Sequence, residues 1–159
     1  MKKHGVLIAM LFLLSFGYAR AQCVPGGLAV VVNKANPVES LSMSQLRKLI
    51  LGDVRNWPNN KSVALIARDP SSQVFQCELS GIVRLSVAEY HRYVISAEFR
   101  GDDPMAIQTV DSDAAALRSV GNSPGGLAIV QAGSAAAAGA SVKVVHVEGK
   151  ALGQPGYPL

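Results

Sequence analysis

The stretch Leu28–Asn59 reads LAVVVNKANPVESLSMSQLRKLILGDVRNWPN and decides the fold. Its first five residues are apolar and mostly β-branched, which predicts a strand buried on both faces. After a polar loop, Ser42 and Gln45 have the spacing of a capping box, and Gly52 stands where a helix-terminating glycine is expected. The pattern therefore predicts a buried strand, a loop and a helix over residues 43–51.

The rest of the chain continues this alternation of strands and helices. The predicted strands are Val63–Ala67, Ala106–Val110, Leu127–Val130 and Val142–Val147, and the predicted helices begin at Ser71 or Ser72, at Ser86, and at Asp111 or Ser112. The alanine-rich run Gly133–Ala140 is interpreted as either a small helix or a mobile loop. Strands that alternate with helices predict an α/β fold, a three-layer sandwich with a largely parallel sheet and helices on both faces.

Residues 1–21 have the three parts of a secretory signal peptide. Two lysines precede an apolar stretch, and small residues stand at positions −3 and −1 of a cleavage site after Ala21. The apolar stretch is shorter than the ~20 residues of a spanning helix. Gln22 precedes Cys23 where a lipoprotein signal has a small residue, so we favour cleavage and export over an uncleaved anchor or a lipidated cysteine. The protein is therefore expected in the periplasm or outside the cell.

Charge and length after cleavage indicate one nearly neutral domain. The chain has 159 residues, with 15 Lys and Arg against 11 Asp and Glu. The signal contains three of the basic residues and no acidic one, so the mature chain of 138 residues carries 12 against 11. This balance argues against nucleic acid as a partner. We expect residues 22–159 to form a single domain.

The mature chain has two cysteines, Cys23 and Cys77. An even number in an oxidising compartment favours a disulfide, which would tie the N-terminal residues to the second helix. The alternative is two unpaired cysteines, one of them buried as a small apolar residue.

Catalytic and metal-binding patterns are not found in the sequence. The mature chain has only two histidines, His91 and His146, and neither stands in a nucleophile motif or at a metal-ligand spacing. We therefore predict a non-enzymatic protein without a metal or a cofactor.

One segment has the residues of an anion site. Arg68 follows the second predicted strand, and Ser71 and Ser72 begin the next helix. Ligands of open parallel sheets bind at the carboxyl ends of strands, and helix N-termini and arginines favour oxyanions. The alternative is that Arg68 pairs with Asp69 on the surface while a serine only caps its helix.

The first helix and the turn after it carry a distinctive motif. Its residues are Leu41-Ser42, Leu46, Leu49-Ile50-Leu51-Gly52, Val54 and Trp57. This spacing resembles that of the periplasmic phosphate-binding proteins of ABC transporters. Later segments resemble short, single-lobe relatives of these proteins, and they are Ser86–Tyr90, Phe99–Gly101, Ser123–Gly125 and Pro155–Leu159. The resemblance implies the fold of one lobe of a type 2 periplasmic binding protein.

The segment after Arg68 departs from the family pattern. Phosphate binders of this family continue with a Ser-Gly-Thr loop, whereas Asp69–Gln73 lacks the glycine and the threonine, and Pro70 has no N–H to donate. A single lobe also leaves its half-site open to water, which weakens contacts to an anion.

The resemblance implies an exported solute-binding-like protein of ABC-type phosphate uptake or sensing. It would bind phosphate or another small oxyanion weakly, near Arg68, Ser71 and Ser72. The alternative is an interaction module that has lost tight ligand binding and docks a membrane transporter, a sensor or a second copy of itself.

Overall fold

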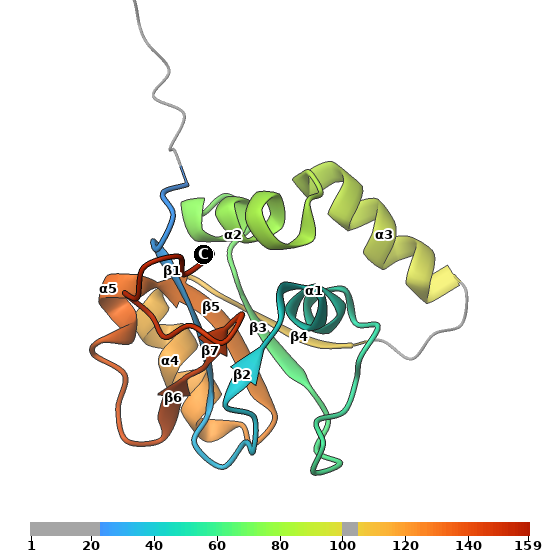
Figure 1. The fold of residues 1–159 in the computed structure, drawn as a ribbon. Helices are drawn as coiled ribbons and strands as arrows, with labels where there is room; N and C mark the ends of the chain where they lie inside the picture. Colours follow the sequence, from blue (N-terminus) through green and yellow to red (C-terminus); the bar gives the residue numbers. More distant parts are fainter. Residues whose placement is uncertain (1–22, 100–104) are drawn as a thin grey trace, which may run out of the picture.

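A five-stranded sheet forms the centre of the molecule (Figure 1). The computed structural model describes residues 23–99 and 105–159, so the predicted signal peptide lies outside the described residues. The strands of the sheet are β1 (Leu28–Asn33), β3 (Ala64–Arg68), β4 (Ala106–Val110), β5 (Gly126–Gln131) and β6 (Val142–Val144). The helices are α1 (Met43–Leu51), α2 (Gln73–Glu78), the π-helical segment η1 (Leu79–Val83), α3 (Val87–Phe99), α4 (Asp113–Asn122) and α5 (Ala132–Ala135).

The sheet is mixed but largely parallel, as predicted. Its strand order is β4-β3-β5-β1-β6. β3 is parallel to both β4 and β5, whereas β1 is antiparallel to both β5 and β6. Four strands therefore point in one direction, and β1 alone runs against them.

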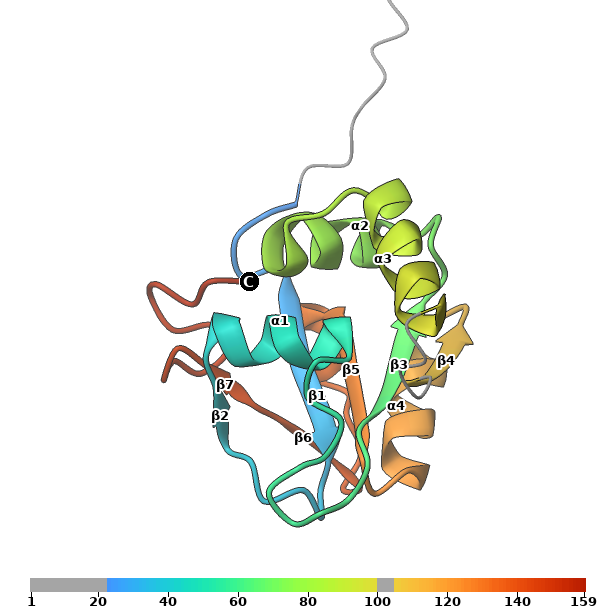
Figure 2. The same ribbon diagram turned by 90° about the vertical axis from the view of Figure 1, so that its right-hand side faces the viewer.

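Helices cover both faces of the sheet, which confirms the predicted three layers. In β1, Val30 and Val32 pack toward α1 and α2, while Ala29 and Val31 pack toward α4 and α5. Figure 2 looks onto the face covered by α1, α2 and α3, with α4 behind the sheet. All six residues of β1 are buried, because the strand lies between two apolar layers.

Helix α1 has the bounds and caps that its sequence predicts. The Ser42 Oγ accepts a hydrogen bond from the Gln45 N–H at 3.1 Å, and the Gln45 Oε1 accepts one from the Ser42 N–H at 2.8 Å. Gly52 ends the helix with a φ of 79°, a left-handed conformation that glycine adopts without strain. Leu46, Leu49 and Ile50 form the buried face.

The predicted strand over residues 142–147 is two strands instead. β6 pairs with β1, whereas β7 (His146–Val147) pairs with β2 (Ser40–Leu41) in a separate small sheet. The change occurs at Val145, which is fully buried and donates its N–H to the Val30 carbonyl at 2.9 Å. An alternating pattern could not reveal that the chain moves from one sheet to another at this residue.

The cysteines are bonded to each other, as favoured. The Cys23–Cys77 disulfide joins the first described residues to α2 over a sequence separation of 54. The chain ends nearby, where Tyr157 and Leu159 are buried against the larger core. Among the described residues, no helix combines the length and apolar character needed to cross a membrane.

Candidate functional site

Arg68 is the last residue of β3, at the end of the sheet where the parallel strands β3, β4 and β5 all finish (Figure 2). Three helices, α2, α4 and α5, begin just after these strand ends. Ligands of open α/β sheets bind at the carboxyl ends of the strands, and Arg68, the arginine that the sequence analysis singled out, lies at one of them.

The guanidinium of Arg68 is already bound to a carboxylate of the same chain, that of Asp113. The Arg68 Nη1 forms an ion pair with the Asp113 carboxylate, and the Arg68 Nη2 donates to the Asp111 carbonyl at 2.9 Å. The second carboxylate oxygen of Asp113 accepts the Gln131 N–H at 3.0 Å. The side chains of Arg68 and Asp113 are only 12% and 10% exposed. Asp113 thus bridges the ends of β3 and β5, at the position where an anionic ligand was expected.

The two serines have internal partners as well. The Asp69 Oδ1 accepts hydrogen bonds from the Ser71 N–H, at 2.8 Å, and from the Ser71 hydroxyl. These hydrogen bonds hold the pKa of the Asp69 carboxyl below its usual value. The Ser72 Oγ accepts the Phe75 N–H at 3.2 Å and caps α2. Ser72 therefore has the capping role of the alternative interpretation. The predicted pairing of Arg68 with Asp69 is wrong, because Asp69 binds Ser71 and the ion-pair partner of Arg68 is Asp113.

One donor of Arg68 is unpaired within residues 23–99 and 105–159. Its Nε is buried and forms no hydrogen bond with any of them. Arg68 also lines a pocket of about 240 Å³ that we call the α3–β4 groove. Ala67, Ile107 and Thr109 come from β3 and β4, and Tyr90, His91, Val94 and Ile95 come from α3. Arg68, Pro70 and Phe75 complete the described lining, and none of its residues is acidic.

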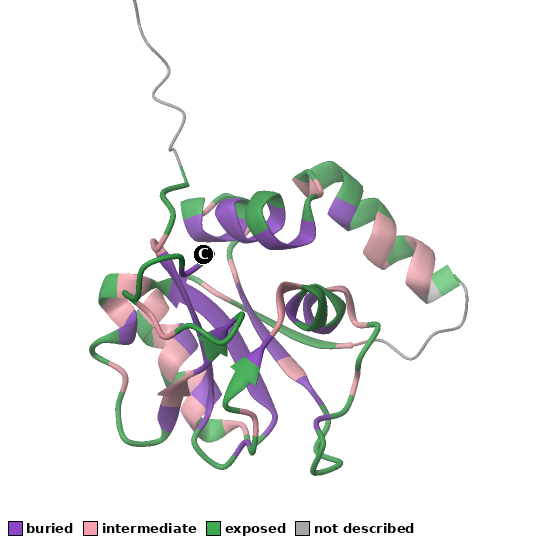
Figure 3. Ribbon diagram, viewed as in Figure 1, coloured by how far each residue is buried: buried purple, intermediate pink, exposed green. Residues whose placement is uncertain are grey.

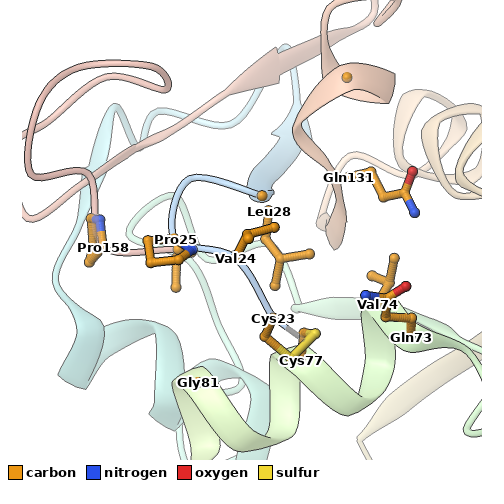
Figure 4. Close-up of a pocket in the computed structure, with 13 residues that line it drawn as sticks. Cys23, Val24, Pro25, Leu28, Gln73, Val74, Cys77, Gly81, Gln131 and Pro158 are labelled. Atoms are coloured by element: carbon orange, nitrogen blue, oxygen red, sulfur yellow. A yellow bond between two sulfur atoms is a disulfide. The ribbon is translucent and has the colours of Figure 1, made fainter. Parts of the chain in front are cut away.

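A second pocket of about 370 Å³ adjoins this region (Figure 4). Its wall includes the Cys23–Cys77 disulfide, Gln73 at the start of α2, Gln131 at the end of β5, and the C-terminal Leu159. Gln131 is the residue whose N–H binds Asp113, so the two regions share this strand end. No local sequence signal could predict this pocket, because four distant segments build it.

Glu78 is a buried carboxyl that sequence reasoning missed. Burial raises the pKa of Glu78 to about 8. Burial, together with the charge of Glu78, raises the pKa of Tyr90 on α3 to about 12. The helical spacing could have predicted this burial. Glu78 lies four residues after Val74 and three after Phe75, and so on the apolar face of α2.

The remaining expectations concern metals and other ligands. Among residues 23–99 and 105–159, no group of three or more His, Cys, Asp or Glu side chains is arranged to hold a metal ion. His91 and His146 are exposed and lie on α3 and β7.

No protein-family model and no curated protein matches the sequence, but solved structures match the fold. An ABC-type phosphate transport receptor from Vibrio cholerae matches over 79% of this chain and 48% of its own, with 24% identity and a TM-score of 0.54. PstS from Borrelia burgdorferi matches over the same shares, with 16% identity and a TM-score of 0.62.

A third structure has a ligand. It is a Clostridium perfringens protein described as a phosphate ABC transporter substrate-binding protein, with bound phosphate. It matches over 81% of this chain and 49% of its own, with 18% identity and a TM-score of 0.61. The chain spans about half the length of these three proteins. The protein therefore has the fold that makes up about half of each of these three proteins, as the motif from Leu41 to Trp57 implied.

Proposed function

We propose that the protein is an exported, non-enzymatic solute-binding-like protein of phosphate uptake or sensing. Its ligand would be phosphate or another small oxyanion, bound weakly at the ends of β3 and β5. The observation that supports the proposal is the position of Arg68 at the carboxyl end of β3, in a fold shared with phosphate receptors. Ligands of open α/β sheets bind at the carboxyl ends of the strands. The disulfide suits an oxidising compartment, in agreement with a signal peptide at residues 1–21.

Weak binding follows from the charges around the arginine. A free oxyanion must displace Asp113 from Arg68 and from the Gln131 N–H, or bind beside it. Asp69 and Asp111 stand on the neighbouring loops, so a phosphate dianion would also meet repulsion. We expect a dissociation constant in the millimolar range, which corresponds to roughly 4 kcal/mol of binding free energy.

Calorimetric titration of residues 22–159 with phosphate and with sulfate tests this proposal. Asp113→Asn removes the competing charge while it keeps the side-chain shape, so it should bind phosphate at least about tenfold more tightly than the natural protein. Asp53→Asn changes an exposed carboxylate that accepts the Tyr93 hydroxyl elsewhere, and it should leave binding unchanged. If neither the natural protein nor either variant releases or absorbs heat up to tens of millimolar phosphate, the oxyanion proposal is wrong.

The location needs a separate measurement. Mass spectrometry of the protein recovered from the periplasm or the medium should give a mature chain that begins at Gln22. An intact N-terminus on membrane-bound protein would contradict the cleavage.

A second candidate function is a docking module for a membrane transporter or sensor. The specific observation in its favour is the α3–β4 groove with exposed apolar side chains around it. Under this function, the Arg68–Asp113 pair stabilises the fold and binds no free phosphate.

A further inference from the structure

Two exposed apolar side chains, Ile95 and Ile107, line the α3–β4 groove, and a third, Phe99, is the last residue of α3. Ile95 is 51% exposed, Phe99 is 88% exposed, and Ile107 is 39% exposed. Within the described residues only Val24 and Val54 are other large apolar side chains of this kind. His91, Ile95 and Phe99 follow each other at intervals of four and so lie on one face of α3. Figure 3 shows the exposed end of α3 and the exposed strand β4.

Strand β4 has a free edge. It pairs with β3 on one side, and no other strand of the described residues pairs with it. Its sequence, AIQTV, contains neither a proline nor a charged residue, the usual features that protect an edge strand. The opposite edge strand, β6, is shorter and carries Lys143, which pairs with Glu39. The β4 edge is therefore the less protected of the two edges.

The groove lies on the side of β4 that faces α3. In the parallel register, Ile107 stands beside Leu65 and Thr109 beside Ala67, and both β3 residues face the larger core. The volume of about 240 Å³ offers room for one or two side chains next to the free backbone edge. Arg68 is part of the lining, and its buried Nε has no hydrogen-bond partner among the described residues.

We propose that this surface binds an extended segment of a partner protein by strand addition. The segment would pair its backbone with β4, place an apolar side chain in the groove, and direct an acidic side chain or a terminal carboxylate toward Arg68 and His91. His91 is an exposed basic residue of the lining, and Arg68 pairs with Asp113 but keeps an unpartnered Nε. None of the described lining residues is acidic, and these features favour an acidic group in the partner. The proposal does not depend on oxyanion binding, and it rests on the second candidate function, for which it names the way a partner is held.

The size of the surface favours a short segment over a second copy of the chain. A stable dimer buries about 800 Å² on each partner. β4 has five residues and is about 17 Å long, and a single small groove accompanies it. An added strand of similar length would cover the exposed apolar side chains and satisfy the free edge.

Selection from a phage-displayed library of random peptides of about twelve residues tests the proposal. The enriched peptides should combine alternating apolar residues with an acidic residue or a C-terminal carboxylate. Titration of the best one, made synthetically, should shift the backbone amide NMR signals of residues 106–110 in the unmutated protein. Ile107→Lys should weaken its binding at least about tenfold, because the new charge stands in the groove.

Val54→Lys is the matched control, since Val54 is 37% exposed and lines a different pocket. It should bind the peptide as the natural protein does. Peptides that bind both lysine variants equally, shifts outside β4 and α3, or no enrichment would overturn the proposal. A dimer in sedimentation velocity that Ile107→Lys dissociates would also overturn it, because the surface would then join two copies.

Discussion

The Asp113 carboxylate binds both the Arg68 guanidinium and the Gln131 N–H, so one side chain joins the carboxyl ends of two parallel strands. Asp113 is also the first residue of α4, where a negative charge interacts favourably with the helix dipole. Arg68, which we expected to bind a free anion, therefore already binds the carboxylate of Asp113.

A double-mutant cycle measures this pair. Arg68→Ala and Asp113→Ala should each lower the free energy of unfolding by about 1–3 kcal/mol, because each leaves a mostly buried charge without its partner. The double variant should lose less than the sum of the single losses. Urea unfolding gives all three values, and additive losses would show that the pair is not coupled.

Glu78 should make stability fall as the pH rises. The unfolded carboxyl ionises above its ordinary pKa of 4.5, while the folded one keeps its proton until about pH 8. The folded state therefore binds more protons between these values, and stability declines across that window. Glu78→Gln removes this decline and should be more stable than the natural protein by on the order of 3 kcal/mol at pH 7.

Glu89→Gln is the control for that measurement, with urea unfolding at several pH values. Hydrogen bonds from Ser86 lower the pKa of Glu89, so the pH dependence of stability that Glu89 contributes has the opposite sign. The stabilisation by Glu89 is present above the pKa of its unfolded state and is lost as the pH falls. A difference between Glu78→Gln and the natural protein that does not change with pH would contradict the assignment.

The disulfide should contribute strongly to stability. A bridge over a separation of 54 residues is worth about 4 kcal/mol in the chain-entropy model. The double variant Cys23→Ala, Cys77→Ala should lose about this amount in urea unfolding. The natural protein in reductant should behave like the variant, and equal stability with and without reductant would contradict the bond.

Gly125 should tolerate no side chain. A Cβ at this position would lie 1.8 Å from the Ser62 carbonyl oxygen, while the Gly125 carbonyl accepts the Trp57 indole N–H at 2.9 Å. Gly125→Ala should therefore shift the Trp57 fluorescence to longer wavelength and lower the melting temperature. Gly139→Ala is the control, because a Cβ there meets no atom within 4 Å. Equal melting temperatures of the two variants would contradict the packing.

Local signals in the sequence determined the elements of the fold. Helix α1 was predictable to its exact residues because Ser42, Gln45 and Gly52 satisfy its ends through neighbours in the chain. The buried run of β1 and the order of elements led to the three layers and the largely parallel sheet. The pattern around Trp57 pointed to the fold of the phosphate receptors, and the two cysteines to their disulfide.

Tertiary structure alone decided the direction of β1, the break at Val145 and the partner of Arg68. Each depends on groups far apart in the chain, and Asp113 is 45 residues from Arg68. A sequence pattern reports which side chains are apolar or charged and how they repeat along one element. The choice between Asp69, Asp113 and a free anion as the partner of Arg68 depends instead on which strand ends and helix starts meet in space, and packing of the whole sheet sets that.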